Sequence, residues 1–474
     1  MSINGQINAS NLSKNYGSKA TIAQILATAV QSLLLIGLGM ELSMPTIVIK
    51  DLYENPNSNF TLSLSQVSWY GSILFIFHPT GSFISGFLQE KFGRKYCMIF
   101  ANIPSILGWI TLHFTNSTIL LYTTSVLMGL SIGFSEAPIL SYVGEITEPR
   151  LRGSMTSLAS AAVMFGSLII FILGFLFEWR TVALLSALCP IASMFLITLI
   201  PESPIWLVSV GKNKKAEKSL CWLRGWVEPK KIQTEYLELI HYNEVSGINN
   251  DSKSASFFKK LAELKNPSVY GPLKLVMIIF FISNIICLSP GRSFINEIFH
   301  KVGILNNHSL ILVIMAVLQN IGYLIIIFTI HHVGKRCLAI FAFSINTVLL
   351  LLFGGYVIVL KNGFISSTPL IPTIIICCIY FFGAGVGSLP WMLISEVFPN
   401  KSRGIATGSC AGMSYLLMFV LTKIYLSVES TLTIEYTLIL FGAIGIFGIV
   451  YLYFYLPETE NKTLLEIEEY FLKL

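Results

Sequence analysis

The stretch SEVFPNKSRG (Ser395–Gly404) places one acid, two bases and a proline between two long apolar runs. A close copy, GEITEPRLRG (Gly144–Gly153), stands about 250 residues earlier in a similar setting. In each copy a glutamate stands seven residues before the arginine of an arginine–glycine pair. Charged segments of this kind are typical of short connections between apolar helices, and their recurrence indicates an internal duplication.

Two further motifs recur in the same order and at nearly the same spacing. KFGRK (Lys91–Lys95) has an echo in HVGKR (His332–Arg336), and PESP (Pro201–Pro204) has an echo in PETE (Pro457–Glu460). Three repeated motifs predict two copies of a unit of six helices. An even number of membrane spans in each copy gives both copies the same orientation, as in parallel-repeat carriers.

The composition indicates that most of the surface faces lipid. The 474 residues are 54% hydrophobic and only 12% charged, and the mean hydropathy is +0.71. A soluble domain carries about 25% charged residues, so this chain cannot cover a surface of that size with charge. Helices are expected, because lipid offers the backbone no hydrogen-bond partner. The net charge of +6 does not indicate nucleic-acid binding, because its placement follows membrane topology.

Twelve apolar runs are each long enough to cross a bilayer as a helix. The sequence therefore predicts an all-α membrane protein with twelve transmembrane helices in two pseudo-symmetric six-helix bundles. The predicted spans are residues 22–45, 66–89, 96–115, 119–142, 155–177, 181–200, 272–294, 309–330, 337–360, 371–394, 405–427 and 434–456.

Lysine and arginine gather in alternate connections, which predicts cytoplasmic placement of both termini and of the central polar segment. The first external loop then carries the sequon Asn59-Phe60-Thr61, a glycosylation acceptor. The first 20 residues lack the apolar region of a cleavable signal peptide. The predicted divisions are a cytoplasmic tail (1–20), a six-helix bundle (21–200), a cytoplasmic helical linker (201–270), a second bundle (271–456) and a cytoplasmic tail (457–474).

Several motifs, in this order, resemble the sugar porter family of the major facilitator superfamily. They are GFLQEKFGRK (86–95), PESPIWL (201–207), GVGSLPW (385–391) and PETENKTLLEIEE (457–469), and YVGEITEPRLRG is most like arthropod facilitated trehalose and hexose transporters. The resemblance implies a monomeric, multi-pass plasma-membrane carrier that moves a sugar by rocking two bundles. It implies neither an enzyme nor a cofactor or metal.

In the family the tryptophan of the tenth span packs against the sugar, and Trp391 stands in that place. An indole offers a flat apolar face and one N–H donor, although Trp391 could instead only pack the bend made by its neighbouring glycines and proline. The residues that we predict to bind the solute are Trp391, Asn284, Gln319, Ser160, Ser283, Ser289 and Tyr415.

The chain departs from the family where sugar hydroxyls need partners. Ser160 replaces a glutamine, the seventh span reads SNIICLSPG in place of its QQ–SG–N pattern, and Ser414-Tyr415 replaces an asparagine–tryptophan pair. Each lost partner in a desolvated site costs about 1–3 kcal/mol. Facilitated diffusion of a hexose or a trehalose-like disaccharide is therefore weighed against two alternatives: a non-transporting sugar sensor, and a proton-coupled carrier of another small polar solute.

Charged residues suggest two further roles. Glu41, Glu136 and Arg292 fall in or beside predicted spans, so either acid offsets Arg292 or binds a proton, or Glu41 and Arg292 lie in water at the external interface. The clusters at the cytoplasmic helix ends are predicted to act as a gate that latches the two bundles together. The gate residues are Glu90, Arg94, Glu145, Arg152, Lys335, Arg336, Glu396 and Arg403.

Overall fold

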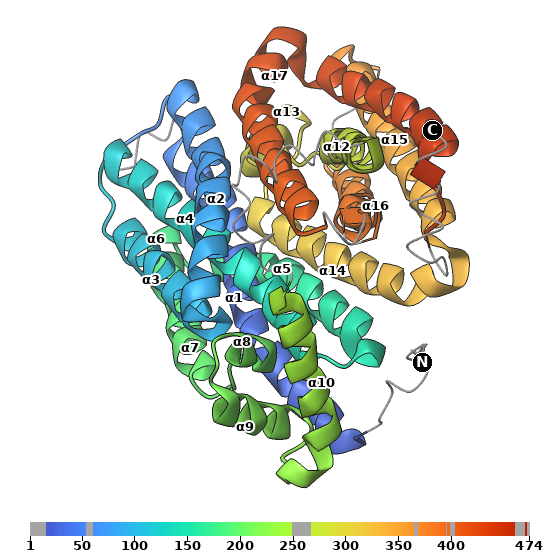
Figure 1. Cartoon of the computed structure of the whole chain (residues 1–474). Coiled ribbons are helices and arrows are strands. Elements are labelled where there is room, and N and C mark those ends of the chain that lie inside the picture. Colours follow the sequence, from blue (N-terminus) through green and yellow to red (C-terminus); the bar gives the residue numbers. More distant parts are fainter. Residues whose placement is uncertain are drawn as a thin grey trace.

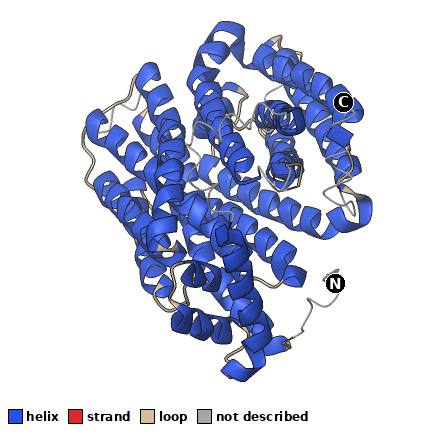
Figure 2. Ribbon diagram, viewed as in Figure 1, coloured by secondary structure: helices blue, strands red, loops and turns tan. Residues whose placement is uncertain are grey.

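The structure is a computed structural model of the whole chain. It describes residues 16–53, 60–248, 267–364, 368–394, 396–398, 403–459 and 470–471. Of the predicted site residues, Asn59 and the side chains of Ser160, Arg152 and Arg403 lie outside this description. Figure 2 shows helices joined by loops. In the described ranges, the β-type pairing is one bridge between Tyr53 and Leu62.

The first group of helices is formed by the apolar runs of the first half. Their bounds are α1 Ser18–Leu52, α2 Leu64–Phe92, α3 Arg94–His113, α4 Thr118–Ile146, α5 Pro149–Leu176, α6 Trp179–Ser186 and α7 Leu188–Ile197. The run predicted as one span at 181–200 is interrupted at Ala187, between α6 and α7.

The central polar segment carries three helices. They are α8 Pro204–Ser209, α9 Asn213–Leu223 and α10 Pro229–Ile248. Trp206 of α8 is buried, and its indole donates to the carbonyl of Glu90 at the end of α2 over 2.9 Å. This contact fixes the segment beneath the first group of helices.

The second group repeats the apolar pattern. Its bounds are α12 Pro267–Ile286, η4 Arg292–Phe294, α13 Ile295–Lys301, α14 His308–Val333, α15 Lys335–Lys361, α16 Leu370–Ile394 and α17 Arg403–Tyr455. Helix α17 is two helices joined at Thr433, whose φ of 66° and ψ of 163° are not helical. The predicted gap between 427 and 434 is thus a one-residue kink.

The span predicted at 272–294 is wrong at its far end. Helix α12 stops at Ile286, and Leu288 adopts a φ of 54° before the Ser289-Pro290-Gly291 turn. Proline lacks the N–H that would continue the helix and disfavours the α conformation in the residue before it. The chain therefore turns here and restarts as η4.

By length and composition, ten helices in the described ranges could cross a membrane. In that count α6 and α7 make one span and α17 makes one, whereas α5 is left out because its apolar stretch 161–176 is too short. Long apolar side chains remain exposed on the outside of these helices, among them Ile119 (78%), Phe328 (74%) and Phe454 (66%). Such a surface suits lipid and not water.

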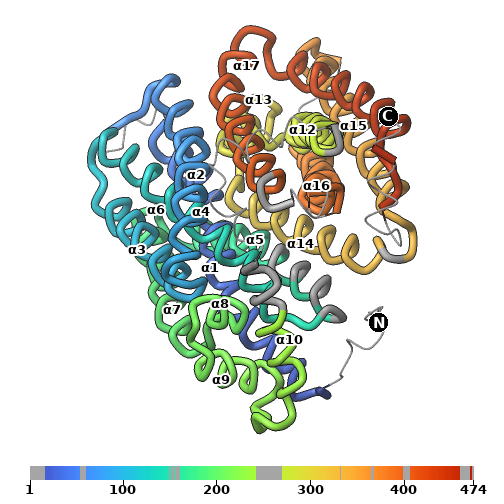
Figure 3. Tube along the Cα trace, viewed as in Figure 1, coloured from blue at the N-terminus to red at the C-terminus, as the bar shows by residue number. Residues whose placement is uncertain are grey.

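The two groups of helices lie side by side (Figure 1), and the tube in Figure 3 follows each from end to end. In the first group α2 and α3 pack on α4, and α1 packs on α5. In the second, α15 packs on α16 and α17, α14 on α16, and α12 on α17. The groups meet along two seams, α2 against α17 and α5 against α14.

Glycine allows α2 and α4 to approach closely. A Cβ atom on Gly133 of α4 would lie 2.1 Å from the carbonyl oxygen of His78, and one on Gly81 of α2 would lie 2.5 Å from that of Leu130. Small residues let helix backbones touch within membranes. Because His78 and Glu136 lie one turn from these glycines, the close packing brings their side chains together.

Candidate functional site

The charged motifs form one cluster in each half. The first-half charge cluster comprises Arg94, Lys95, Glu145, Glu202 and Ser203, and the second-half charge cluster comprises Lys335, Arg336, Glu396, Glu458 and Thr459. Arg94 pairs with Glu145 at 2.8 Å, and Lys335 pairs with Glu396 at 2.5 Å. Each of these two ion pairs of the described residues lies within one half.

Burial affects the pKa of one acid in these clusters. Glu202 lies between α7 and α8, where its carboxylate accepts the backbone N–H of Lys95. Burial raises the pKa of Glu202 above its ordinary value, whereas the backbone N–H groups that it accepts act against that rise. Two other predicted gate residues take no part in these ion pairs. Glu90 is exposed, and Arg336 donates to the carbonyl of Tyr453.

The two halves touch at the opposite end of the helices, far along α2 and α14 from the charge clusters. Thr46 of α1 donates to the carbonyl of Arg292 over 3.1 Å, and Asn296 donates to the carbonyl of Thr46 over 3.0 Å. Lys50 donates to Ser309, and Ser68 donates to the carbonyl of Lys423. We call this set the cross-half contacts.

An aromatic and acidic cluster lies on the α2–α17 seam. The rings of His78 and Tyr415 stack with centroids 3.5 Å apart, and Trp391 lies 5.7 Å from Tyr415 and 5.2 Å from Phe280. His78 Nε2 lies 2.8 Å from a Glu136 oxygen, and the Tyr415 hydroxyl donates to the other oxygen over 3.4 Å. Trp391 is 40% exposed, so part of its indole has no protein cover.

The cluster carries side chains of the kinds that contact a hydroxylated ring. Trp391 offers an apolar face, while Glu136 offers an acceptor that is 14% exposed. His78 is fully buried, with its Nε2 facing Glu136 and its Nδ1 without a hydrogen-bond partner. The structure brings Trp391 and Tyr415 together with Glu136, as a shared solute site requires.

The other predicted solute residues are spread along α12 and α14. Ser283 is buried and donates to the carbonyl of Phe280 in its own helix. Asn284 and Ser289 are half-buried near the break after α12, and Gln319 lines a cavity with Arg292. Gln319's neighbour Asn320 donates instead to the carbonyl of Met164 on α5, across the halves.

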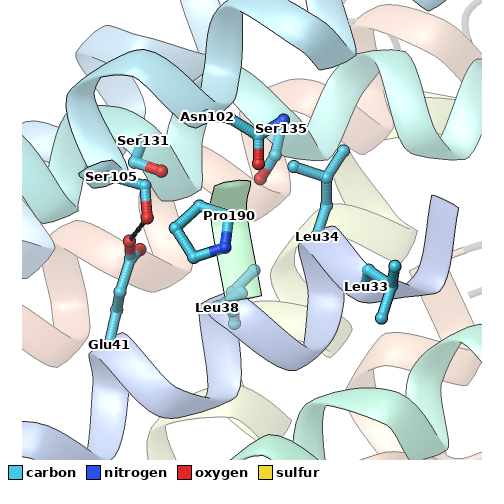
Figure 4. A pocket seen from close by; sticks show the side chains of 10 residues that line it. Leu33, Leu34, Leu38, Glu41, Asn102, Ser105, Ser131, Ser135 and Pro190 are labelled. Carbon is cyan, nitrogen blue, oxygen red and sulfur yellow. Dashed lines mark hydrogen bonds between the residues drawn. The ribbon is translucent and has the colours of Figure 1, made fainter. Parts of the chain in front are cut away.

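Glu41 lies inside the first half and away from both seams. Its carboxyl accepts from Ser105 over 2.5 Å and is 1% exposed (Figure 4). Asn102, Ser131 and Ser135 share the small cavity beside it. Neither Glu41 nor Glu136 contacts Arg292, so the pairing that we expected between one of these acids and this arginine is not formed.

Sequence reasoning missed His78 and Tyr380. A histidine inside the apolar run of α2 was a usable signal, because ionisable residues within spans are rare. Tyr380 gave no signal, because tyrosine is common in apolar helices. Its role depends on a tertiary neighbour, Arg292, which lies about 90 residues away in the sequence.

Comparison with known proteins gives consistent matches. The chain matches the sugar (and other) transporter family over residues 3–471. It is 26% identical to the facilitated trehalose transporter Tret1 of Culex quinquefasciatus, over 95% of this chain and 86% of that one. It is also 26% identical to human solute carrier family 2, facilitated glucose transporter member 6, over 91% and 88% of the two chains.

A solved structure shares the fold. The E. coli xylose transporter XylE, in the proton:xylose symporter structure with 6-bromo-6-deoxy-D-glucose, superposes with a TM-score of 0.74 at 17% identity. The match covers 95% of this chain and 99% of that one. With a family match over nearly the whole chain, the protein belongs to the sugar (and other) transporter family.

Proposed function

We propose that this protein moves a sugar across a membrane by facilitated diffusion, through alternating access of two six-helix halves. Splitting α17 at Thr433 and counting all 28 residues of α5 raises the ten candidate spans to twelve. The repeated charge clusters support the same division. The relatives named for trehalose and glucose transport suggest a hexose or a trehalose-like disaccharide.

The contacts suggest which state this conformation represents. The halves are joined by the cross-half contacts at one end, whereas each charge cluster is paired within its own half at the other. If the charge clusters lie on the cytoplasmic side, as their lysines and arginines predict, the carrier is closed to the outside. The gate role then means that the clusters exchange partners between halves when the inside closes.

The observation that carries the solute site is the junction of Trp391, Tyr415 and Glu136. It combines an apolar ring face with a charged acceptor at the seam where the halves move. Hydrogen bonds to ionised groups contribute about 1.5–3 kcal/mol, more than neutral ones. Glu136 can therefore replace part of the polar contact that the family's glutamine and asparagine residues supply.

The test is uptake by the purified protein in liposomes. Labelled trehalose, glucose and fructose would be compared with and without an imposed proton gradient. We expect saturable uptake of at least one sugar, with no acceleration by the gradient. Trp391→Ala should raise KM about tenfold, equivalent to about 1.4 kcal/mol, and Trp391→Phe should raise it less.

Trp226→Phe is the matched control, because Trp226 is 54% exposed in the connection between α9 and α10. Sugar binding without uptake would favour a sensor over a carrier. Gradient-driven uptake that Glu136→Gln abolishes would replace facilitated diffusion with proton coupling. Unchanged kinetics in Trp391→Ala would remove the solute site from this cluster.

The placement in the cell follows from the same reading. We propose a monomer in the plasma membrane, with both termini and helices α8–α10 in the cytoplasm and a glycan on Asn59. The domain limits at residues 20, 200, 270 and 456 belong to this proposal. Cysteine labelling of intact cells at positions 210 and 306 would test it, since only the second position should react.

A further inference from the structure

The break after α12 turns Arg292 into the region between the halves. Its guanidinium carbon lies 5.9 Å from the ring centre of Phe171 on α5, and Nη2 reaches Ser43 Oγ of α1 at 3.4 Å. Arg292 Nε is buried and has no hydrogen-bond partner. An arginine side chain keeps its proton, so this half-buried cation makes few hydrogen bonds.

The acids on neighbouring elements are engaged elsewhere. Glu41 of α1 accepts from Ser105, Glu429 of α17 pairs with Lys301 at 2.7 Å, and Glu435 pairs with Lys361 at 2.7 Å. The described residues of α5 around Phe171, and α14 from Ser309 to Ile330, hold no acid. Within the described chain, Arg292 therefore has no carboxylate partner.

A small cavity adjoins the guanidinium. It measures about 10 Å³, close to the minimum for one water-sized group. Its wall is mostly apolar, with Phe171 and Met315 among the residues that form it, and Arg292, Gln319 and Tyr380 add the polar groups. The Tyr380 hydroxyl is also buried without a partner. Two unpaired donors beside one cavity suit a negatively charged guest.

We propose that closing the outer end captures one singly charged anion, a halide or a carboxylate, between Arg292 and Tyr380. Leaving water costs a guanidinium several kcal/mol unless an anion accompanies it. The cross-half contacts through Thr46 and Asn296 seal this end. An anion that neutralises Arg292 therefore favours the closed state. The inference rests on the proposed alternating access.

The anion has two sources with the same chemistry. A chloride ion can enter beside a neutral sugar, or the solute can bring its own carboxylate, as a hexuronate does. The experiment separates them with full-length protein, first by thermal stability and then by uptake. Stability is measured without sugar, so it reports on the anion even if the chain transports none of the tested sugars.

In the stability arm, chloride replaces sulfate, which is neither a halide nor a carboxylate, at constant ionic strength. We expect chloride or glucuronate to raise the melting temperature of the native protein, and to leave Arg292→Gln and Arg292→Leu unchanged. Tyr380→Phe should weaken the apparent anion affinity severalfold. Arg180→Gln is the matched control, since Arg180 lies at the start of α6 and donates to the carbonyl of His113; it should keep the full response.

In the uptake arm, labelled glucose enters liposomes in chloride or in sulfate. A tenfold faster rate in chloride, lost in Arg292→Gln, assigns the anion to chloride. Saturable uptake of glucuronate that needs Arg292 assigns it to the solute. Arg292→Lys keeps the charge and should retain part of either response. If no tested anion alters stability or uptake, or if Arg292→Leu responds like the native protein, the proposal is wrong.

Discussion

The first-half and second-half charge clusters share one backbone geometry, but the arginine and the lysine in them stand in opposite order. Gly93 ends α2 at φ 98°, ψ 165°, and Gly334 ends α14 at φ 87°, ψ 153°. At the start of the helix that follows each glycine, a carboxylate accepts backbone N–H groups. Glu202 accepts the N–H of Lys95, and Glu458 accepts the N–H of Lys335 and of Arg336. An acid at a helix N-terminus satisfies free N–H groups and offsets the helix dipole.

The bases that follow the two glycines are swapped. Arg94 pairs with Glu145 through two nitrogens, at 2.8 and 3.1 Å, whereas Lys335 meets Glu396 through one, at 2.5 Å. The other base of each pair donates to backbone carbonyls at the end of its half. The position thus requires a cation, not a particular residue. A planar fork holds its partner more rigidly than a point charge, so the second-half cluster should release first.

The largest loss of stability should come from the glycines, where a steric clash adds to backbone strain. A Cβ at Gly93 would lie 2.3 Å from Glu202 Oε2, and one at Gly334 would lie 2.7 Å from Glu458 Oε2. Their backbone conformation is one that almost only glycine adopts, at a cost of about 1–3 kcal/mol for other residues. Gly93→Ala should therefore lower the melting temperature most and Gly334→Ala somewhat less. Gly86→Ala, with open space at its Cβ, should change little.

Removing the central acid is the next test. Glu145 also accepts from Ser203, and Glu396 accepts from Thr459 over 2.7 Å. Glu145→Gln leaves Arg94 unpaired at 16% exposure and should cost about 3 kcal/mol. Glu396 is 30% exposed, so Glu396→Gln should cost about 1 kcal/mol. Melting curves in detergent measure both, with exposed Glu228→Gln as control; equal losses would refute the ranking.

A third test exchanges the bases of the two clusters. Arg94→Lys removes one of two hydrogen bonds to Glu145 and should cost about 1 kcal/mol. Lys335→Arg should be neutral or stabilising, because the second cluster gains a fork. If looser binding lets the second cluster release first, Lys335→Arg should also slow uptake while Arg94→Lys does not. The opposite pattern in transport rates would contradict that order.

The repeated motifs made much of this predictable from sequence. Gly93 and Gly334, each followed by two bases, fix their local geometry because neighbours in the chain supply it. The apolar runs likewise predicted the helices. By contrast, the Glu136–His78 pair depends on the close approach of two helix backbones at Gly133. No local pattern encodes that approach.

Arg292 shows the same limit. A charge beside a predicted span implied either an acidic partner, on the general cost of burying charge, or a place in water at the external interface. The candidate partners of Arg292 were acids that lie at a suitable depth in the membrane along their helices. The structure turns Glu41 toward α3 and Glu136 toward α2. The rotation of each helix about its own axis decides these contacts, and a sequence of mostly apolar residues does not reveal that rotation.

The smallest effect concerns pH at Glu202. Burial raises the pKa of this carboxyl, so the folded protein binds its proton more tightly than the unfolded chain. Its contribution to stability is then greatest below the unfolded pKa of about 4.3 and declines as pH rises through the raised folded pKa.

Glu202→Gln removes that decline while keeping an acceptor for the Lys95 N–H. The melting temperature of the native protein should therefore fall more, as the pH rises above about 4.3, than that of Glu202→Gln, with Glu458→Gln measured in parallel. Parallel slopes for native protein and Glu202→Gln would mean that the N–H groups and the neighbouring Arg94 outweigh burial at this carboxylate.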